Sequence, residues 1–273
     1  MSTPPPLEIP IFCPRQCRQA VVHGAARIEL NASGSYPQGG LTPSLDELRA
    51  VREFLDSNPS PGPGVAVRVM IRPRCRPPGG AEPDFLYSPA ELEAMRAAAA
   101  EFRGSGLLRE QAGDGFVFGC LKRAAGEGGR VEVDAAANRM LVDAVRPFKC
   151  VFHRAFDDVV ASSTAGGKRW SQGLEQIVAC GFDGILTSGR PGNAPDNVES
   201  LKIVVEAAQG RVEIIVGGGL RSGNVASLAE VFATPGARIA AHSSCLRAGA
   251  VDEGINEQEV INLVEKLSST STS

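Results

Sequence analysis

The sequence predicts an α/β protein that folds as a single (β/α)8 TIM-type barrel, and three observations support this. Eight short β-type runs alternate with longer helical patterns from end to end, which indicates a parallel sheet. The length of 273 residues is close to the roughly 250 that one barrel takes. No G-x-G-x-x-G follows the first expected strand, which weighs against an open dinucleotide-binding sheet, so no nucleotide cofactor is expected. We expect one domain over 1–273 with its core at about 7–267, and disordered tails at 1–6 and 268–273.

The expected strands are short apolar, β-branched runs bounded by glycine, proline and polar residues. In chain order they are 7–12, 27–31, 65–71, 115–121, 149–153, 184–188, 212–216 and 238–242. The clearest helical patterns lie between them, at 44–57, 89–103, 134–145, 170–180, 198–209 and 256–267. Ser88, Pro89 and Glu91 have the spacing of a capping box with proline in the first turn, so a helix should begin there.

Four segments interrupt this alternation and are expected to form long loops. They are rich in proline, glycine or small polar residues, and they span 57–64, 74–84, 124–130 and 161–168. The segment 74–84 follows an expected strand. In a barrel it therefore belongs to the face where the strands end, which carries the active site in this fold.

The composition excludes several classes of partner. The net charge is -3, from 28 basic and 31 acidic residues, so we expect no general affinity for nucleic acid or for an anionic membrane. No apolar run approaches the ~20 residues that cross a bilayer. Residues 1–6 lack the basic and apolar regions of a signal peptide. The seven cysteines are an odd number scattered through apolar segments, which is typical of reduced thiols and predicts a cytoplasmic protein.

Side-chain alternation places ionisable residues at one end of the predicted barrel. Successive side chains on a strand point to opposite faces, so Glu29 points inward if its apolar neighbours face the helices. The same rule puts further charged residues on the inner face where the third, fifth and eighth strands end. The candidate catalytic residues at this mouth are Glu29, Arg72, Arg74, His153, Arg154, Asp157 and His242.

Each candidate also has a structural interpretation. Glu29 can pair with Arg72 to hold the top of the barrel, and His153 can be a hydrogen-bonded core histidine. The third histidine, His23, precedes glycine at an expected helix end and reads as a C-terminal cap. Buried charge is costly unless it is paired, so the convergence of several charges at one end favours a functional site.

A second set of residues predicts an anion site. Loops after strands seven and eight commonly bind phosphate in this fold, and glycine lets backbone N–H groups approach an anion. The alternative is a tight turn that needs a positive φ. The candidate anion-binding residues are Ser188, Gly217, Gly218, Gly219, Ser243 and Ser244.

Together, these segments make the sequence resemble the CutC family of copper homeostasis proteins. The motifs that carry the resemblance run in order along nearly the whole chain: RIEL at 27–30, GGLTPS at 39–44, VMIRPR at 69–74, DFLYS at 84–88, GDGFVFG at 113–119, FHRAFD at 152–157, LTSG at 186–189 and GGG at 217–219. The resemblance implies a (β/α)8 barrel, a cytoplasmic location and homo-oligomers. It also implies a role in copper handling, with Cu(I) bound by cysteine thiolates in some members.

The sequence departs from the copper-binding pattern at two positions. Where the resemblance implies cysteines, this chain has Pro10 and Asn31, and neither is the soft ligand that Cu(I) prefers. Cys13 and Cys17 lie nearby at helical i, i+4 spacing and are the alternative thiol pair. Free cysteines are usually packing residues, so no metal ligand is assigned here.

Two functions therefore remain open. The resemblance implies a copper homeostasis protein with a metal ion as its ligand. The inward residues favour an isomerase or lyase that acts on a small anionic substrate, which can be phosphorylated. In that enzyme Glu29 or Asp157 is the base, and His153 or His242 exchanges protons near neutral pH. Arginine side chains would bind carboxylate or phosphate, because the guanidinium fork matches these oxyanions.

Overall fold

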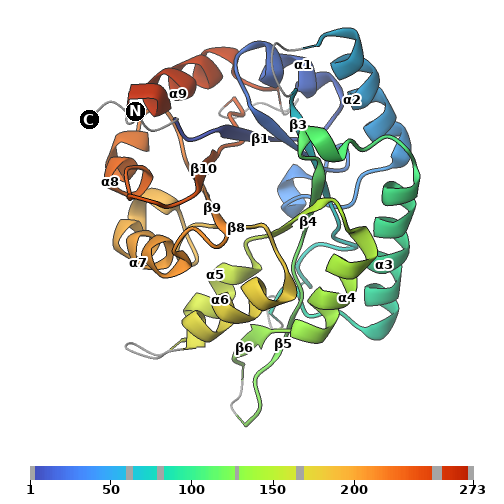
Figure 1. Cartoon of the computed structure of the whole chain (residues 1–273), viewed down its shortest axis with the longest axis vertical. Helices are drawn as coiled ribbons and strands as arrows, with labels where there is room; N and C mark the ends of the chain where they lie inside the picture. Colours follow the sequence, from blue (N-terminus) through green and yellow to red (C-terminus); the bar gives the residue numbers. More distant parts are fainter. Residues whose placement is uncertain are drawn as a thin grey trace.

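The computed structural model describes residues 4–59, 64–78, 83–126, 129–163, 169–247 and 254–269. Eight parallel strands close a barrel in the order β1-β10-β9-β8-β7-β4-β3-β2, and helices surround it (Figure 1). The predicted TIM-type fold is therefore confirmed. The barrel strands are β1 (Leu7–Ile11), β2 (Arg27–Leu30), β3 (Ala66–Met70), β4 (Gly115–Phe118), β7 (Lys149–Phe152), β8 (Gly184–Thr187), β9 (Glu213–Gly217) and β10 (Ile239–His242).

The helices lie outside the barrel, and the α-helices among the described residues number nine. They are α1 (Arg15–Val22), α2 (Leu45–Ser57), α3 (Pro89–Gly104), α4 (Ala135–Val145), α5 (Ala155–Ala161), α6 (Arg169–Cys180), α7 (Val198–Ala208), α8 (Ala229–Phe232) and α9 (Glu257–Ser269). The predicted capping box at α3 is present, because Ser88 accepts from the Glu91 N–H and Glu91 accepts from the Ser88 N–H.

The structure corrects three expectations about the elements. The predicted strand 115–121 is two strands, because β4 ends at Phe118 and Leu121 begins β5 (Leu121–Arg123). This strand pairs with β6 (Val131–Val133) in an antiparallel hairpin beside the barrel, so the predicted loop 124–130 is its connection. The helices α1, α5 and α8 are absent from the predicted set. α9 continues through Ser269, two residues past the expected core limit.

Parts of the expected loops and tails lie outside the described residues. These parts are 60–63, 79–82, 127–128, 164–168, 1–3 and 270–273. In the described part of the chain, no helix is both long enough and apolar enough to span a membrane.

The barrel interior is divided into an apolar half and a polar half. Six buried apolar residues from neighbouring strands pack together inside it: Met70, Val117, Val151, Leu186, Ile215 and Ala240. Ionisable side chains of β1, β2, β3 and β10 fill the other half: Glu8, Arg27, Glu29 and Arg68 are buried, and the His242 side chain is 12% exposed. The outward faces of the same strands carry residues such as Ile9, Ile28 and Val67, which are fully buried under the helices.

Ion pairs join Arg27 to two carboxylates at the N-terminal ends of these strands. Arg27 Nη1 lies 2.6 Å from Glu213 Oε2, and Arg27 Nε lies 3.2 Å from Glu8 Oε2. Arg68 donates to the Gly113 carbonyl. Buried charges are tolerated when paired in this way, and the pairing leaves the C-terminal end of the barrel free for other groups.

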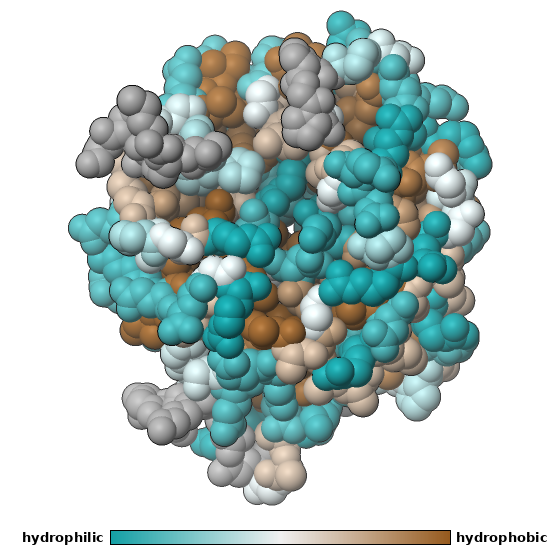
Figure 2. Space-filling model, viewed as in Figure 1, coloured by the Kyte–Doolittle hydropathy of each residue, from teal (hydrophilic) through white to brown (hydrophobic). Residues whose placement is uncertain are grey.

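The face of the molecule shown in Figure 2 is mainly polar. Hydrophilic side chains surround the centre of the face shown in Figure 2, and apolar side chains appear between them in separate patches. Among the described residues, the large apolar side chains that are exposed are Val22, Tyr36 and Ile203. Single apolar residues scattered over a water-exposed surface are normal.

Candidate functional site

A cavity of about 700 Å³ opens where the barrel strands end. It is lined by residues of the strand ends and of the loops that follow them, as expected for the active face of this fold. The predicted site residues that line it are Glu29, Arg72, His153, Arg154, Asp157, Gly218, Gly219, His242, Ser243 and Ser244. The predicted residues that do not line it are Arg74, Ser188 and Gly217.

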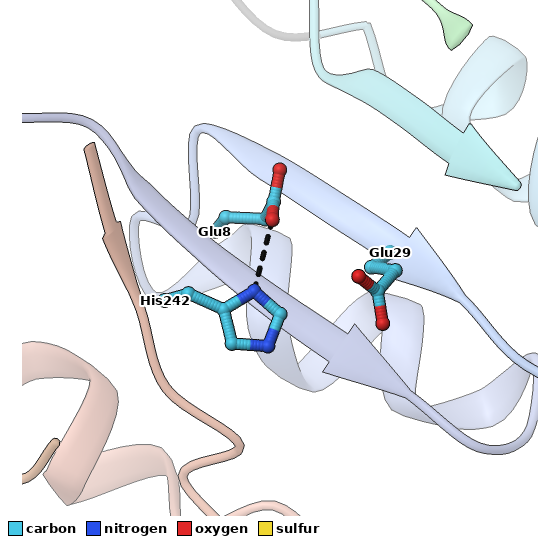
Figure 3. Close-up of side chains that lie close together, drawn as sticks. All are labelled: Glu8, Glu29 and His242. Carbon is cyan, nitrogen blue, oxygen red and sulfur yellow. Dashed lines mark hydrogen bonds and ion pairs between the residues drawn. The ribbon is translucent and has the colours of Figure 1, made fainter. Parts of the chain in front are cut away.

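Glu8, Glu29 and His242 meet inside the barrel below this cavity (Figure 3). The register of the sheet brings them together, because β1 lies between β2 and β10 and pairs Glu8 with His242. His242 Nδ1 is 2.9 Å from Glu8 Oε1, and Glu29 Oε1 accepts from Asn31 Nδ2 at 3.1 Å. One ligand atom of each of the three residues lies within 4.8 Å of the others, so they can hold a metal ion.

Burial and neighbouring charges determine which groups of this cluster are protonated. Burial opposes ionisation of Glu8, but the charge of Arg27 and the His242 hydrogen bond outweigh it and lower the pKa of Glu8 to about 2. Burial disfavours the charged form of His242, yet the hydrogen bond to Glu8 and the charge of Glu29 raise its pKa. Burial raises the pKa of Glu29. Glu8 is therefore the permanent carboxylate of the cluster and Glu29 the one that holds a proton more readily.

His153 is a neutral imidazole in this structure. Burial and the charge of Arg72 lower its pKa to about 3, so it does not exchange a proton near neutral pH as predicted. Its Nδ1 accepts from the Ala155 N–H at 3.2 Å, which assigns the remaining proton to Nε2. That nitrogen is buried without a hydrogen-bond partner, and the ring contacts Phe85 in a tilted arrangement with centroids 4.4 Å apart. His153 can thus offer one N–H to a ligand.

Arg72 is held at the mouth by acceptors other than Glu29. Its Nη1 donates to the carbonyls of Gln38 and Gly40 at 2.6 and 2.8 Å, and its Nη2 donates to Asp84 at 2.8 Å. The interpretation in which Glu29 pairs with Arg72 is therefore wrong. The Nε of Arg72 is buried and has no partner, so it is a second unused donor beside the cavity.

Asp157 and Ser188 form a closed hydrogen-bond network. Asp157 accepts from Thr187 Oγ1 at 2.5 Å, from the Ser188 N–H at 3.1 Å and from Arg154 Nε at 2.8 Å. The Ser188 hydroxyl accepts from Arg154 Nη2 at 2.8 Å and lies near both Asp157 and the Arg190 carbonyl. The hydroxyl of Ser188 is thus fully hydrogen-bonded within the protein, so Ser188 is not available to bind an anion. Asp157 holds Arg154 in place and is therefore a positioning residue.

The loop after β9 shows why its glycines are needed. Gly218 and Gly219 have φ values of 101° and 69°, which side chains disfavour. A Cβ on Gly218 would lie 3.1 Å from Arg154 Nη1, and one on Gly219 would lie 2.6 Å from Asn193 Oδ1. The turn interpretation therefore holds for both residues, and the backbone also approaches a cationic side chain closely. Gly217 is extended, and a Cβ there would meet Leu186 at 2.7 Å.

Arg221 is a site residue that sequence reasoning missed. It lines the cavity, and its guanidinium donates to Ser243 Oγ and Ser244 Oγ at 3.1 Å each. It joins the loops after β9 and β10, which are the two loops predicted to bind an anion. The signal that could have found it is its place two residues after the glycine run.

Arg74 is turned away from the cavity, contrary to the prediction. Its Nε donates to Glu91 of α3 at 2.5 Å, and its Nη2 donates to the Leu86 carbonyl at 2.6 Å. β3 ends at Met70. Strand alternation therefore does not determine where a side chain four residues later points. Arg74 therefore anchors the start of α3 rather than a ligand.

Comparison with known proteins places the chain in a family. The CutC family profile matches residues 6–244. The chain belongs to the CutC family. A CutC family protein of Bacteroides fragilis is 35% identical over 214 residues, which cover 78% of this chain and 71% of the relative. The human copper homeostasis protein cutC homolog is 35% identical, over 76% of this chain and 62% of its own length. A crystal structure of CutC from Streptococcus agalactiae has a TM-score of 0.69 at 26% identity, covering 88% and 98% of the two chains.

The thiols of this CutC chain lie away from the cavity. Cys17 is buried on α1, where burial raises its pKa to about 12, and Cys13 lies half-buried beside it. Neither residue lines the cavity, and the sulfur atom that does is the thioether of Met70. Pro10 lines the cavity and Asn31 holds Glu29, so the positions where the resemblance implies cysteines face the barrel interior in this CutC chain.

Glu8 is the second site residue that sequence reasoning missed. The alternation rule finds it, because Leu7, Ile9 and Ile11 share the outward face of β1 and Glu8 lies between them. It is 1% exposed, and without its partners a buried carboxylate would be strongly destabilising.

Proposed function

We propose that this chain takes part in copper homeostasis, the role named for its CutC relatives, through a ligand site at the mouth of the barrel. The observation that supports the proposal is the family match, which spans residues 6–244 and includes every strand of the barrel. The relatives that carry this role in their names are similar over most of the chain.

The donors around the cavity do not fit a Cu(I) site made of two thiolates. Cu(I) prefers soft sulfur ligands, and the described lining offers carboxylate and guanidinium groups, the imidazoles of His153 and His242, and the Met70 thioether. We therefore assign no copper ligand and derive no step that passes through bound copper.

The copper role can be tested in the organism that encodes the chain. Deletion of the gene should change copper tolerance, and a copy with Cys13→Ser and Cys17→Ser should restore it as well as the unaltered copy. Unchanged tolerance after deletion would contradict the role. Restoration by the unaltered copy alone would show that Cys13 and Cys17 carry it.

A titration with a chromophoric Cu(I) competitor tests the donor set directly. The unaltered chain should bind Cu(I) more weakly than the variant with both Pro10→Cys and Asn31→Cys, which places one thiol on β1 and one directly after β2. Equal affinities in the two proteins would mean that these positions do not set copper binding.

A second candidate function is catalysis on a small anionic substrate, of isomerase or lyase type. The specific observation in its favour is that Arg72 Nε and His153 Nε2 are buried donors without partners in a cavity that Arg154 and Arg221 also line. Unsatisfied buried donors cost about 1–3 kcal/mol each, and a bound oxyanion would satisfy them. In this proposal Glu29 is the acid or base, and the arginines bind the anion.

Inorganic phosphate and a small sugar phosphate are suitable probes for this candidate. A ligand that binds only the folded state raises the melting temperature. We expect both probes to raise it in the unaltered chain, and Arg221→Gln to reduce the shift. No shift at matched ionic strength with either probe would remove the phosphate form of this proposal.

A further inference from the structure

Two ligand atoms inside the barrel are free while the other atom of the same side chain is engaged. Asn31 Nδ2 occupies Glu29 Oε1, and Glu29 Oε2 is buried without a hydrogen-bond partner. His242 Nδ1 is hydrogen-bonded to Glu8 Oε1, and within the described chain Nε2 of the same ring has no hydrogen bond. Partners of this kind usually orient the ligands of a metal, because they fix the tautomer of a histidine and the direction of a carboxylate.

Glu8 and Glu29 approach the His242 ring from different directions. In Figure 3 the Glu8 carboxylate faces Nδ1 of the ring, and the Glu29 carboxylate lies beside the ring, away from Glu8. Ligand atoms of the three residues lie within 4.8 Å of one another. Glu29 is 4% exposed, so its unpartnered oxygen is enclosed by the protein rather than by bulk water.

We propose that Glu29 and His242 bind a divalent cation at the floor of the cavity, with Glu8 as the outer carboxylate that holds the imidazole. Glu8 takes the outer position because its Oε2 lies 3.2 Å from Arg27 Nε and its Oε1 contacts His242. This arrangement is the carboxylate–histidine–metal triad, in which the outer carboxylate makes the imidazole a stronger ligand.

The donor set defines the chemical class of the cation. A carboxylate oxygen and an imidazole nitrogen suit Mn²⁺, Fe²⁺, Co²⁺ or Zn²⁺, and they do not suit Cu(I). Glu29 and His242 both line the cavity, so the remaining coordination positions face it and are available to water or to a substrate oxygen. The proposal goes beyond the copper role and does not depend on it, because it uses no thiol.

Titration of the full-length, thiol-reduced protein with Mn²⁺ tests this site, with free Mn²⁺ measured by electron paramagnetic resonance. We expect about one equivalent to bind, and Glu29→Gln and His242→Gln each to weaken binding by more than about tenfold. Asp183→Asn is the control, because Asp183 is a carboxylate with a side chain 21% exposed that does not line the cavity, and it should bind as the unaltered chain does.

If a variant fails to fold, the visible and near-ultraviolet absorption spectrum of the unaltered chain with Co²⁺ tests the proposal independently. Oxygen and nitrogen ligands should give only weak visible bands, whereas an intense near-ultraviolet band would show that cysteine thiolates hold the metal. That band, an unaltered Mn²⁺ affinity in folded Glu29→Gln, or no Mn²⁺ binding at all would overturn the proposal. Loss of copper tolerance in the gene deletion would bear on the copper role alone.

Discussion

Neighbouring groups, more than intrinsic chemistry, decide what each ionisable side chain of the barrel mouth can do. His153 and His242 both end strands, yet burial beside Arg72 keeps the first neutral while Glu8 raises the pKa of the second. The sequence predicts the position of both histidines from alternation. It does not predict their protonation, because the deciding charges come from strands that are distant in sequence.

Gly218 permits a residue-scale test of the anion site. Gly218→Val should reduce the rise in melting temperature that phosphate produces, because the new side chain would crowd Arg154 and strain a backbone with φ of 101°. The control is Gly236→Val, which introduces similar strain at φ of 72° with no atom within 4 Å of the new Cβ. Equal phosphate shifts in the two variants would place the anion elsewhere.

Asp158 should make stability depend on pH. Burial and the charge of Asp157 raise its pKa from 3.8 to about 6, while Arg76 and Arg154 oppose the rise and Asp84 adds to it. The folded state therefore holds the proton more tightly than the unfolded state, so this carboxyl lowers stability as the pH rises from about 4 to about 6.

The variant Asp158→Asn should then melt at a higher temperature than the unaltered chain at pH 7, and the difference should vanish below about pH 4. Melting curves at several pH values measure this. Asp46→Asn, whose side chain is 89% exposed, should show no such pattern. A difference that stays constant with pH would mean that Asp158 acts through packing rather than charge.

At the scale of elements, one buried carboxylate ties α2 and β3 to the start of β4. Asp114 is fully buried and accepts from the N–H groups of Val67 and Arg109 at 2.7 Å each and from Arg52 of α2. Asp114→Ala would leave Arg52 buried without a countercharge, which costs about 3–5 kcal/mol. Chemical denaturation should show this loss, while Asp46→Ala at the exposed pair with Arg49 should cost no more than about 1 kcal/mol. A similar small loss for both variants would contradict the role of Asp114.

The hairpin of β5 and β6 shows the limit of element prediction. Only Gly119 and Cys120 separate its first strand from β4. Apart from these two residues, nothing in the apolar run 115–121 indicates a boundary between two strands. The chain leaves the barrel there because the Leu121 N–H bonds to the Phe85 carbonyl and Asn138 holds both polar groups of the Cys120 backbone. These contacts come from α4 and from the loop before α3, which a local pattern does not reveal.

At the scale of the whole molecule, closure of the barrel brings the two ends of the chain together. β1 pairs with β10, so Glu8 meets His242 across 234 positions of sequence (Figure 1). The interior is thereby divided between an apolar half and a polar half, and the polar half opens into the cavity. Alternation can place each residue inside, but only closure decides which of them are neighbours.

The resemblance to CutC implies that the chain assembles into homo-oligomers. We expect sedimentation analysis to give a mass that is a multiple of 28.6 kDa. A single species of 28.6 kDa at every concentration tested would contradict this expectation.

The sequence by itself determined the barrel, the order of its eight strands and the end at which Glu29, Arg72, His153 and His242 lie, because strand alternation and helix capping are local properties. Alternation could place Glu8 inside the barrel, but only the tertiary structure decided that Glu8 contacts His242. It also decided that Arg221 joins the site and that Arg74 and Ser188 leave it. The physical reason is that a hydrogen bond or ion pair depends on distances of about 3 Å between atoms of different elements, and local periodicity carries no information about them.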